Sequence, residues 1–256
     1  MSPHRPRKRF GQHFLKDPGV IDAIIHAVGA TKSDTVVEIG PGLGAITRSL
    51  AARAGTLHAI EFDRDLITKL NREYDGAANV TVHEADALRF DYSSLGDSLR
   101  IVGNLPYNIS TPLLFHLLNY RDCIVDMHFM LQKEVVDRMA ANPGSKSYGR
   151  LGIMLGCHFQ IDALFDVAKE AFDPPPKVTS AVVRLAPLPA GTYVINNEDR
   201  LSRLVATAFS QRRKTIRNSL SKVVDEAQLV DAGIDPGLRP EAISIADYVR
   251  LANALE

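Results

Sequence analysis

The chain has 256 residues, of which 45% are hydrophobic and 23% charged, and its 30 basic residues balance 30 acidic ones. This is the composition of an ordinary globular protein with room for a substantial core. No apolar run approaches the roughly 18 residues of a membrane span, and no apolar region follows the basic N-terminus as in a secretory signal. We therefore expect a cytoplasmic protein with no membrane partner.

Cysteines and charges narrow the expectation further. Cys123 and Cys157 lie in apolar segments without metal-ligand spacing, so we expect buried thiols in a reducing compartment and no metal site. Residues 1–16 and 209–222 each contain five basic residues and no acid. Two such clusters in a neutral chain predict contact with a polyanion, although a solvated tail and a solvated helix face are the alternatives.

The first predicted element is a helix framed by Asp17, Pro18 and Gly29, with isoleucine and valine along one face. Strands and helices then alternate, at 35–40 (strand), 45–54 (helix), 56–62 (strand), 64–74 (helix), 79–85 (strand), 100–104 (strand), 111–120 (helix), 123–131 (strand) and 132–141 (helix). Such alternation is typical of right-handed βαβ units around a parallel sheet buried on both faces.

The pattern changes in the last third of the chain. Extended segments at 164–168 and 180–185 leave no room for a crossover helix, which predicts an antiparallel hairpin at the sheet edge. Residues 187–193 read as a linker before four helical segments. We therefore expect an α/β domain over residues 1–186, including the basic N-terminal segment, and a small all-helical domain over 194–256.

A glycine-rich turn, EIGPGLG, connects the first strand of the alternation to its helix. Gly40 and Gly42 allow a tight turn and close approach of a ligand to the main chain, while the helix N–H groups attract negative charge. Alone, this turn also suits dinucleotide-binding enzymes or a purely structural connection. Its G-x-G-x-G spacing is one residue tighter than the pyrophosphate fingerprint.

Two carboxylates follow at later strand ends. Glu61, 21 residues after Gly40, can accept both hydroxyls of a ribose, and Asp86 can accept a hydrogen bond from an adenine amine. An amino acid at the glycine turn, a ribose and an adenine together describe S-adenosylmethionine. Each acid alone could be a surface charge. An NAD-binding oxidoreductase is disfavoured by the glycine spacing and by the lack of a plausible hydride-transfer partner.

The stretch VGNLPYNIS follows a further strand, whose end should face the same crevice. By itself it reads as a turn. Suppose that the group to be methylated is an exocyclic aromatic amine. Two hydrogen-bond acceptors for its N–H groups would then localise the nitrogen lone pair toward the methyl group of the cofactor. The side-chain oxygen of Asn104 and the carbonyl of Pro106 are candidates, and Tyr107 can stack on the base. Catalysis would then be mostly alignment.

Seven segments follow one another over nearly the whole chain: FGQHFLKD, VEIGPGLG, EFDRDL, VGNLPYNISTPLLFHLL, MLQKEV, AFDPPPKVTSAVVRL and FSQRRKTIRNSL. In this order they resemble the ribosomal RNA adenine N6-dimethyltransferases of the KsgA type. The resemblance implies a class I methyltransferase (Rossmann-like) fold. It also implies S-adenosylmethionine-dependent dimethylation of two adjacent adenines in a hairpin loop near the 3′ end of small-subunit (16S) ribosomal RNA, during ribosome assembly.

The resemblance also implies site residues. Cofactor contacts are expected at His13, Leu15, Gly40, Gly42, Glu61, Asp86 and Asn104. Phe172 is expected to face Tyr107 across a flipped base, with a core phenylalanine as the alternative. RNA contacts are expected at Arg7, Lys8, Arg9, Arg212, Arg213, Lys214 and Arg217. The expected partner is the assembling 30S subunit, and the expected state is a monomer without a metal.

Two other functions stay open. One is an RNA-binding assembly factor for which methylation is secondary. The other is a large-subunit ribosomal RNA adenine methyltransferase, which would share the NLPY core. The QRRKTIRN segment and the PPPKV context favour the small-subunit type.

Overall fold

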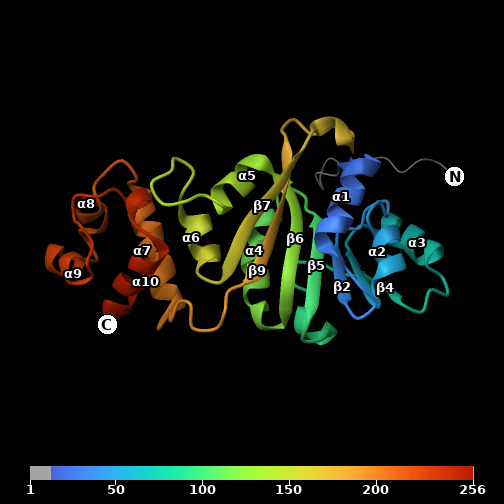
Figure 1. The fold of residues 1–256 in the computed structure, drawn as a ribbon, viewed down its shortest axis with the longest axis horizontal. Coiled ribbons are helices and arrows are strands. Elements are labelled where there is room, and N and C mark those ends of the chain that lie inside the picture. Colours follow the sequence, from blue (N-terminus) through green and yellow to red (C-terminus); the bar gives the residue numbers. More distant parts are fainter. Residues whose placement is uncertain (1–12, 256) are drawn as a thin grey trace. The chain divides into compact units, whose positions relative to one another are not determined.

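The computed structural model describes residues 13–255 (Figure 1). By its contacts the chain divides into two compact units. The sheet unit comprises the chain up to Val136 together with Asp162–Pro187, and the helical unit comprises Asp137–Ile161 together with the chain from Leu188 on. The functional division, with catalysis within 1–186 and RNA contact within 194–256, stays a prediction.

One seven-stranded sheet has the strand order β4-β3-β2-β5-β6-β9-β7. Its strands are β2 (Thr35–Ile39), β3 (Thr56–Glu61), β4 (Val80–Glu84), β5 (Leu99–Asn104), β6 (Ile124–Gln132), β7 (Phe159–Val167) and β9 (Ser180–Pro187). The pairings from β4 through β6 are parallel, and β9 runs antiparallel to β6. The predicted parallel sheet with an antiparallel edge is therefore confirmed.

The register of the parallel strands brings their carboxyl ends to one edge. Ile39 pairs with both Ile60 and Gly103, and Asn104 pairs with Met130. The loops that follow these strands therefore start at the same level, which is where ligands bind in open parallel sheets.

As predicted, helices alternate with strands along the sheet unit: α1 (Pro18–Val28), α2 (Thr47–Arg53), α3 (Arg64–Glu73) and α4 (Ser110–Leu118). Helix α5 (Lys133–Met139) begins in the sheet unit and ends in the helical unit. The Asp17 carboxylate caps α1 by accepting from the N–H groups of Gly19 and Val20. Helix α2 starts two residues later than predicted, because the turn continues through residue 46. Short 3-10 helices are η2 (Tyr92–Leu95), η3 (Arg121–Cys123) and η4 (Lys169–Ala171).

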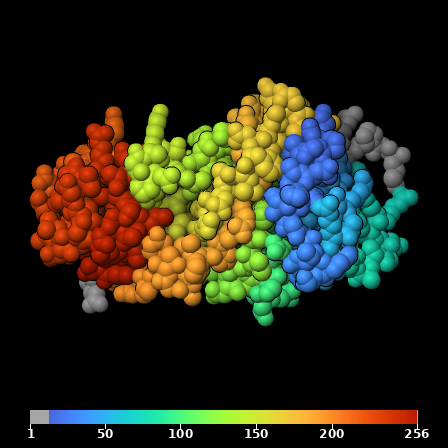
Figure 2. All heavy atoms as spheres, viewed as in Figure 1, coloured from blue at the N-terminus to red at the C-terminus, as the bar shows by residue number. Residues whose placement is uncertain are grey.

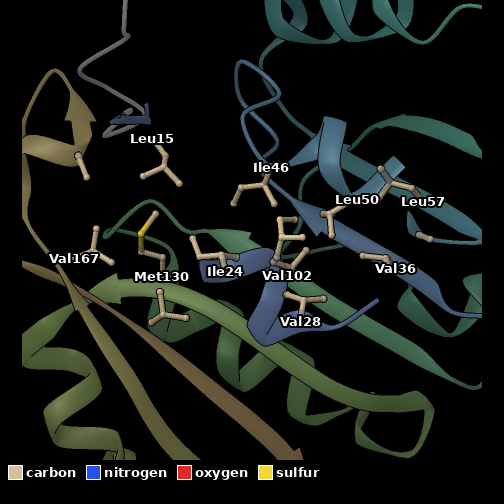
Figure 3. Packing of buried hydrophobic residues seen from close by; sticks show 14 of the residues in the cluster. Leu15, Ile24, Val28, Val36, Ile46, Leu50, Leu57, Val102, Met130 and Val167 are labelled. Carbon is tan, nitrogen blue, oxygen red and sulfur yellow. The ribbon is translucent and has the colours of Figure 1, made fainter. Parts of the chain in front are cut away.

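A hydrophobic core cluster lies between α1 and the middle of the sheet (Figure 3). Ile24 and Val28 of α1 pack with Val36 of β2, Val102 of β5 and Met130 of β6. Each of these side chains is at most 2% exposed, and burying such a side chain contributes roughly 1.5–3 kcal/mol. The two cysteines are free and buried, as expected.

A second, two-stranded antiparallel sheet joins distant parts of the chain. Strand β1 (Phe14–Leu15) pairs with β8 (Phe172–Asp173), so that Leu15 lies opposite Phe172. Both side chains belong to the core cluster of α1. Figure 2 shows the side chains of α1, in blue, beside those of the β7–β8 region, in yellow. The sequence did not predict this pairing.

The helical unit contains the four predicted C-terminal helices, α7 (Glu198–Ser210), α8 (Ile216–Leu220), α9 (Glu226–Asp231) and α10 (Ile245–Ala254), together with η5 (Pro240–Ala242) and α6 (Arg150–Gly156). Helix α6 was not predicted. Ser244 caps α10 by accepting from the N–H of Asp247 at 3.1 Å. Within residues 13–255, none of the helices combines the length and the apolar character needed to cross a membrane.

Candidate active site

A cavity of about 290 Å³ opens at the carboxyl ends of β2, β3 and β5. Its walls are β1 and the loops after β2, β3, β4 and β5. The structure brings nine of the predicted site residues together there: His13, Leu15, Gly40, Gly42, Glu61, Asp86, Asn104, Pro106 and Tyr107. The motifs therefore converge on one site although they are dispersed along the sequence.

The glycine turn exposes main chain to this cavity. Gly40 and Gly42 adopt φ angles of 67° and 61°, which side-chain-bearing residues rarely adopt. A Cβ on Gly42 would lie 3.2 Å from the ring of Phe14, which covers the turn. Glycine at this position therefore serves both the backbone conformation and the close approach of β1.

Glu61 fixes the loop after β3 and faces the cavity. Its Oε1 accepts from the N–H groups of Phe62 and Asp63 at 2.8 and 2.9 Å, and its Oε2 accepts from Gly42 at 3.2 Å. Burial raises the pKa of this carboxyl, and the three N–H donors oppose the rise. Each carboxylate oxygen can accept more than one hydrogen bond, so a ribose hydroxyl can still be accepted.

Asp86 also lines the cavity, in the loop after β4. Its Oδ1 accepts from the N–H of Leu88 at 3.0 Å, which holds the side chain at the start of the loop. The exposed guanidinium of Arg89 is 4.0 Å from Oδ2. A second lone pair on each oxygen stays available for a donor in the cavity.

The orientation of the Asn104 amide follows from its neighbour on β1. Asn104 Nδ2 donates to the carbonyl oxygen of His13 at 3.0 Å. Because a carbonyl can only accept, the amide nitrogen must be the atom that faces it. The side-chain oxygen of Asn104 is left as an acceptor, and it makes no hydrogen bond to any residue within 13–255.

Pro106 and Tyr107 complete the loop after β5. The carbonyl of Pro106 accepts from the N–H of Ile109 at 3.1 Å, which closes a turn and leaves one lone pair of that oxygen. The half-buried ring of Tyr107 faces the ring of His13, with centroids 6.0 Å apart and planes inclined by 28°. His13 Nδ1 lies 2.7 Å from the carbonyl oxygen of Pro174 and therefore donates to it.

The structure does not bring Phe172 to the cavity. Its side chain is 1% exposed and packs in the core cluster of α1. The ring that faces Tyr107 belongs to His13 instead. A stacking role for Phe172 stays a prediction, and its position here is that of a core residue.

Two cavity residues were missed by sequence reasoning. Glu38 of β2 is 2% exposed, and its Oε2 has no hydrogen-bond partner among residues 13–255. Burial raises the pKa of Glu38 to about 8; the Thr47 side chain opposes this rise and the charge of Glu61 adds to it. Phe62 presents a 60% exposed ring at the rim. A carboxylate inside an apolar strand and an aromatic ring after a strand end were the available signals.

The predicted RNA-contact residues divide into three groups. Arg7, Lys8 and Arg9 lie outside the described residues. Arg212 and Arg217 make ion pairs with Glu241 and Glu226, at 3.6 and 3.2 Å. The remaining two, Arg213 and Lys214 between α7 and α8, are exposed and form no ion pair within the part of the chain that the structure describes.

Comparison with known proteins shows similarity over the whole chain. Residues 3–256 match the sequence model of the family "Ribosomal RNA adenine dimethylase". The chain is 56% identical over 255 residues to "Ribosomal RNA small subunit methyltransferase A" of Dechloromonas aromatica (strain RCB), covering 100% of both proteins.

Two solved structures share the fold. A dimethyladenosine transferase from Plasmodium falciparum matches with a TM-score of 0.82 at 29% identity, covering 93% of this chain and 96% of that one. The 23S rRNA methyltransferase ErmE matches with a TM-score of 0.76 at 26% identity, covering 94% and 99%. Together with the family match, these similarities show that the chain belongs to the ribosomal RNA adenine dimethylase family.

Proposed function

We propose that the protein transfers methyl groups from S-adenosylmethionine to N6 of two adjacent adenines in the 3′-terminal hairpin loop of small-subunit (16S) ribosomal RNA. The products are N6,N6-dimethyladenosines. The observation that carries the proposal is the Asn104 amide, whose nitrogen is taken by the His13 carbonyl and whose oxygen is left as an acceptor. This acceptor lies in the same cavity as the residues suited to the cofactor.

The side chains of the cavity suit the parts of S-adenosylmethionine. Glu38 Oε2, which has no hydrogen-bond partner among residues 13–255, is a buried acceptor that an ammonium group can satisfy. Glu61 can accept ribose hydroxyls, Asp86 can accept from the adenine amine, and the glycine turn offers main chain at close range. When bound, the cofactor supplies a methyl group on a positively charged sulfur.

The NLPY loop acts on the acceptor amine. The lone pair of an exocyclic adenine amine is delocalised into the ring, so the nitrogen is a poor nucleophile. Asn104 Oδ1 and the Pro106 carbonyl accept its two N–H bonds, which draws the nitrogen toward tetrahedral geometry. Tyr107 stacks on the base, a contact worth about 1–3 kcal/mol. Neutral acceptors suffice because the proton can leave after transfer, and most of the rate enhancement is alignment.

The proposed partner is the assembling 30S subunit, approached by a monomer. The exposed cations Arg213 and Lys214, which make no ion pair with any residue in 13–255, support contact with ribosomal RNA, because basic groups that neutralise phosphates release counterions. Full-length similarity to a relative named as a small-subunit enzyme supports this substrate over a large-subunit one.

The direct test is incubation of the protein and S-adenosylmethionine with unmethylated small subunits, followed by digestion and identification of the modified nucleoside. N6,N6-dimethyladenosine at a tandem pair of adenines is expected. Parallel reactions use large-subunit RNA and DNA. Methylation of either of these, with none in the small subunit, would contradict the proposal.

A further inference from the structure

A serine outside the NLPY loop contacts the ring that is proposed to stack on the base. The Tyr107 hydroxyl lies 3.2 Å from Ser180 Oγ, within hydrogen-bond distance. Ser180 is 1% exposed and is the first residue of β9, where it pairs with Gln132 of β6. The residue before it, Thr179, accepts from the N–H of Lys133 at 3.0 Å. The serine is therefore held by sheet backbone, whereas Tyr107 lies on a loop.

The phenol end of Tyr107 depends on this one contact. Among residues 13–255, Ser180 is the only hydrogen-bond partner of the Tyr107 hydroxyl. The other hydrogen bond at this residue, from Ser110 Oγ to the Tyr107 carbonyl at 3.2 Å, holds only the backbone end. Together the two contacts hold the main chain at Tyr107 and the hydroxyl end of its ring, and so fix the direction of the ring's long axis.

If the protein acts as proposed above, the two methyl transfers place unequal demands on the position of this ring. In the first transfer, both N–H bonds of the amine are accepted, one by Asn104 and one by Pro106. After it, the monomethylated amine retains one N–H, so one acceptor loses its donor. The base is then positioned by one hydrogen bond fewer, and stacking on Tyr107 contributes a larger share of its alignment.

We propose that Ser180 is a positioning residue that holds the hydroxyl end of the Tyr107 ring, and thereby the ring's position against the base, and that this contact matters most for the second methyl transfer. Loss of the contact leaves the ring in place but widens its range of orientations. The second transfer then slows more than the first, and monomethyladenosine accumulates.

The test is a double-mutant cycle with Ser180→Ala and Tyr107→Phe in the full chain, on unmethylated small subunits. Single-turnover reactions give the rate constants of both transfers from the amounts of N6-methyladenosine and N6,N6-dimethyladenosine. Each single variant should slow the second transfer about fivefold, the effect of one typical hydrogen bond, and the first about twofold. The double variant should be no slower than either single variant, because both remove the same contact.

Ser219→Ala is the matched control. Ser219 is a 6% exposed serine of the helical unit whose hydroxyl donates to the Ile216 carbonyl, and its loss should leave the product ratio at the wild-type value. Tyr107→Phe keeps the ring, so this arm remains decisive if Ser180→Ala fails to fold. Equal slowing of both transfers, or additive losses in the double variant, would overturn the proposal. A wild-type protein that forms no dimethyladenosine would instead overturn the proposed function.

Discussion

At the scale of single residues, the Asn104 amide gains its direction from a main-chain carbonyl. An asparagine side chain can present either a donor or an acceptor to a ligand. The His13 carbonyl removes that ambiguity, because it takes the N–H side at 3.0 Å. The acceptor is therefore oriented before any substrate arrives, which is the condition for catalysis by alignment.

Replacing Asn104 with alanine should abolish most of the activity without unfolding the protein. We expect the single-turnover rate to fall by about 100-fold or more, in line with the loss of one preorganised polar group at a reacting centre. Binding of small subunits, measured by filter retention, should be unchanged. Asn119→Ala, at the exposed end of α4, is the control and should keep the wild-type rate. A normal methylation rate for Asn104→Ala would refute the mechanism. If cells with this inactive variant still assembled small subunits normally, the assembly-factor role would be favoured as the main one.

Glu38 makes stability depend on pH. Its folded-state pKa of about 8 lies above the ordinary value of 4.5. Between these pH values the folded protein retains a proton that the unfolded chain has lost, so the free energy of unfolding decreases as the pH rises from about 4.5 to 8. It stays at the lower level at higher pH. The total effect is on the order of a few kcal/mol.

Glu38→Gln tests this linkage, because glutamine has no proton to lose. Urea unfolding between pH 5 and pH 9 should give a flatter profile for the variant, which gains stability relative to the wild type as the pH rises. The buried carboxyl of Glu61 also has a raised pKa and remains in both proteins, so a residual slope of the same sign is expected. Parallel profiles would show that Glu38 is not protonated in the folded protein near neutral pH.

At the scale of elements, the pairing of β1 with β8 decides the environment of Phe172. Two-residue strands contribute few hydrogen bonds, but Leu15 and Phe172 both insert into the cluster under α1. The same pairing carries His13 to its contacts with Asn104 and Pro174. Both the core packing of Leu15 and Phe172 and the position of His13 in the site therefore depend on this small sheet.

Phe172→Ala should consequently be a stability variant. Removing a buried phenylalanine typically lowers the free energy of unfolding by about 3–5 kcal/mol, and we expect a loss of this size in urea. Phe62→Ala, with a 60% exposed ring, serves as comparison and should change stability by less than about 0.5 kcal/mol. If Phe172→Ala instead kept its stability and only slowed methylation, the stacking role would be supported.

Periodicity and caps sufficed to predict most elements, but not α6. This helix contains Gly152 and Gly156, and glycine lowers helix propensity. The structure explains them by close packing, since a Cβ on Gly152 would lie 2.8 Å from the Arg138 carbonyl and one on Gly156 would lie 2.7 Å from Ile245. The local sequence shows the glycines that disfavour a helix, but it does not show the close tertiary contacts that require them.

In the site, too, local sequence patterns predicted some residues, and long-range contacts determined others. Residues that follow strand ends, such as Glu61 and Asn104, were predictable because parallel strands place their ends together. The burial of Phe172 was not predictable, because nothing local distinguishes a buried ring from an exposed one, and its stacking role stays a prediction. Glu38 was overlooked because strand alternation assigns it to the core without saying that its carboxylate opens into a cavity.

At the scale of the whole molecule, charge is concentrated although its sum is zero. Several basic side chains are neutralised by acidic neighbours, as Arg217 is by Glu226. Arg213 and Lys214 are exposed between two helices and make no ion pair within residues 13–255. These two are therefore available to neutralise phosphates.

Binding to small-subunit RNA should weaken steeply with salt. Each phosphate neutralised on a single strand contributes about −0.7 to the log–log slope, so Arg213→Ala with Lys214→Ala should make the slope shallower by about 1.4. Arg53→Ala, an exposed change at the end of α2, is the charge control and should leave the slope unchanged. Titrations at several salt concentrations give the slopes, and a nearly flat wild-type response would argue against this surface.

The pairing of β1 with β8 also determines when the pocket can be completed during translation. His13 and its partner Pro174 are 161 residues apart in sequence, and β1 cannot take its place in the cavity wall until β8 exists. At about 5–20 residues per second, translation needs roughly 8–30 s to cover that distance. A growing chain therefore carries the glycine turn and the NLPY loop for many seconds without a finished pocket. The wall that β1 forms is therefore completed late, after about two thirds of the 256 residues have been made.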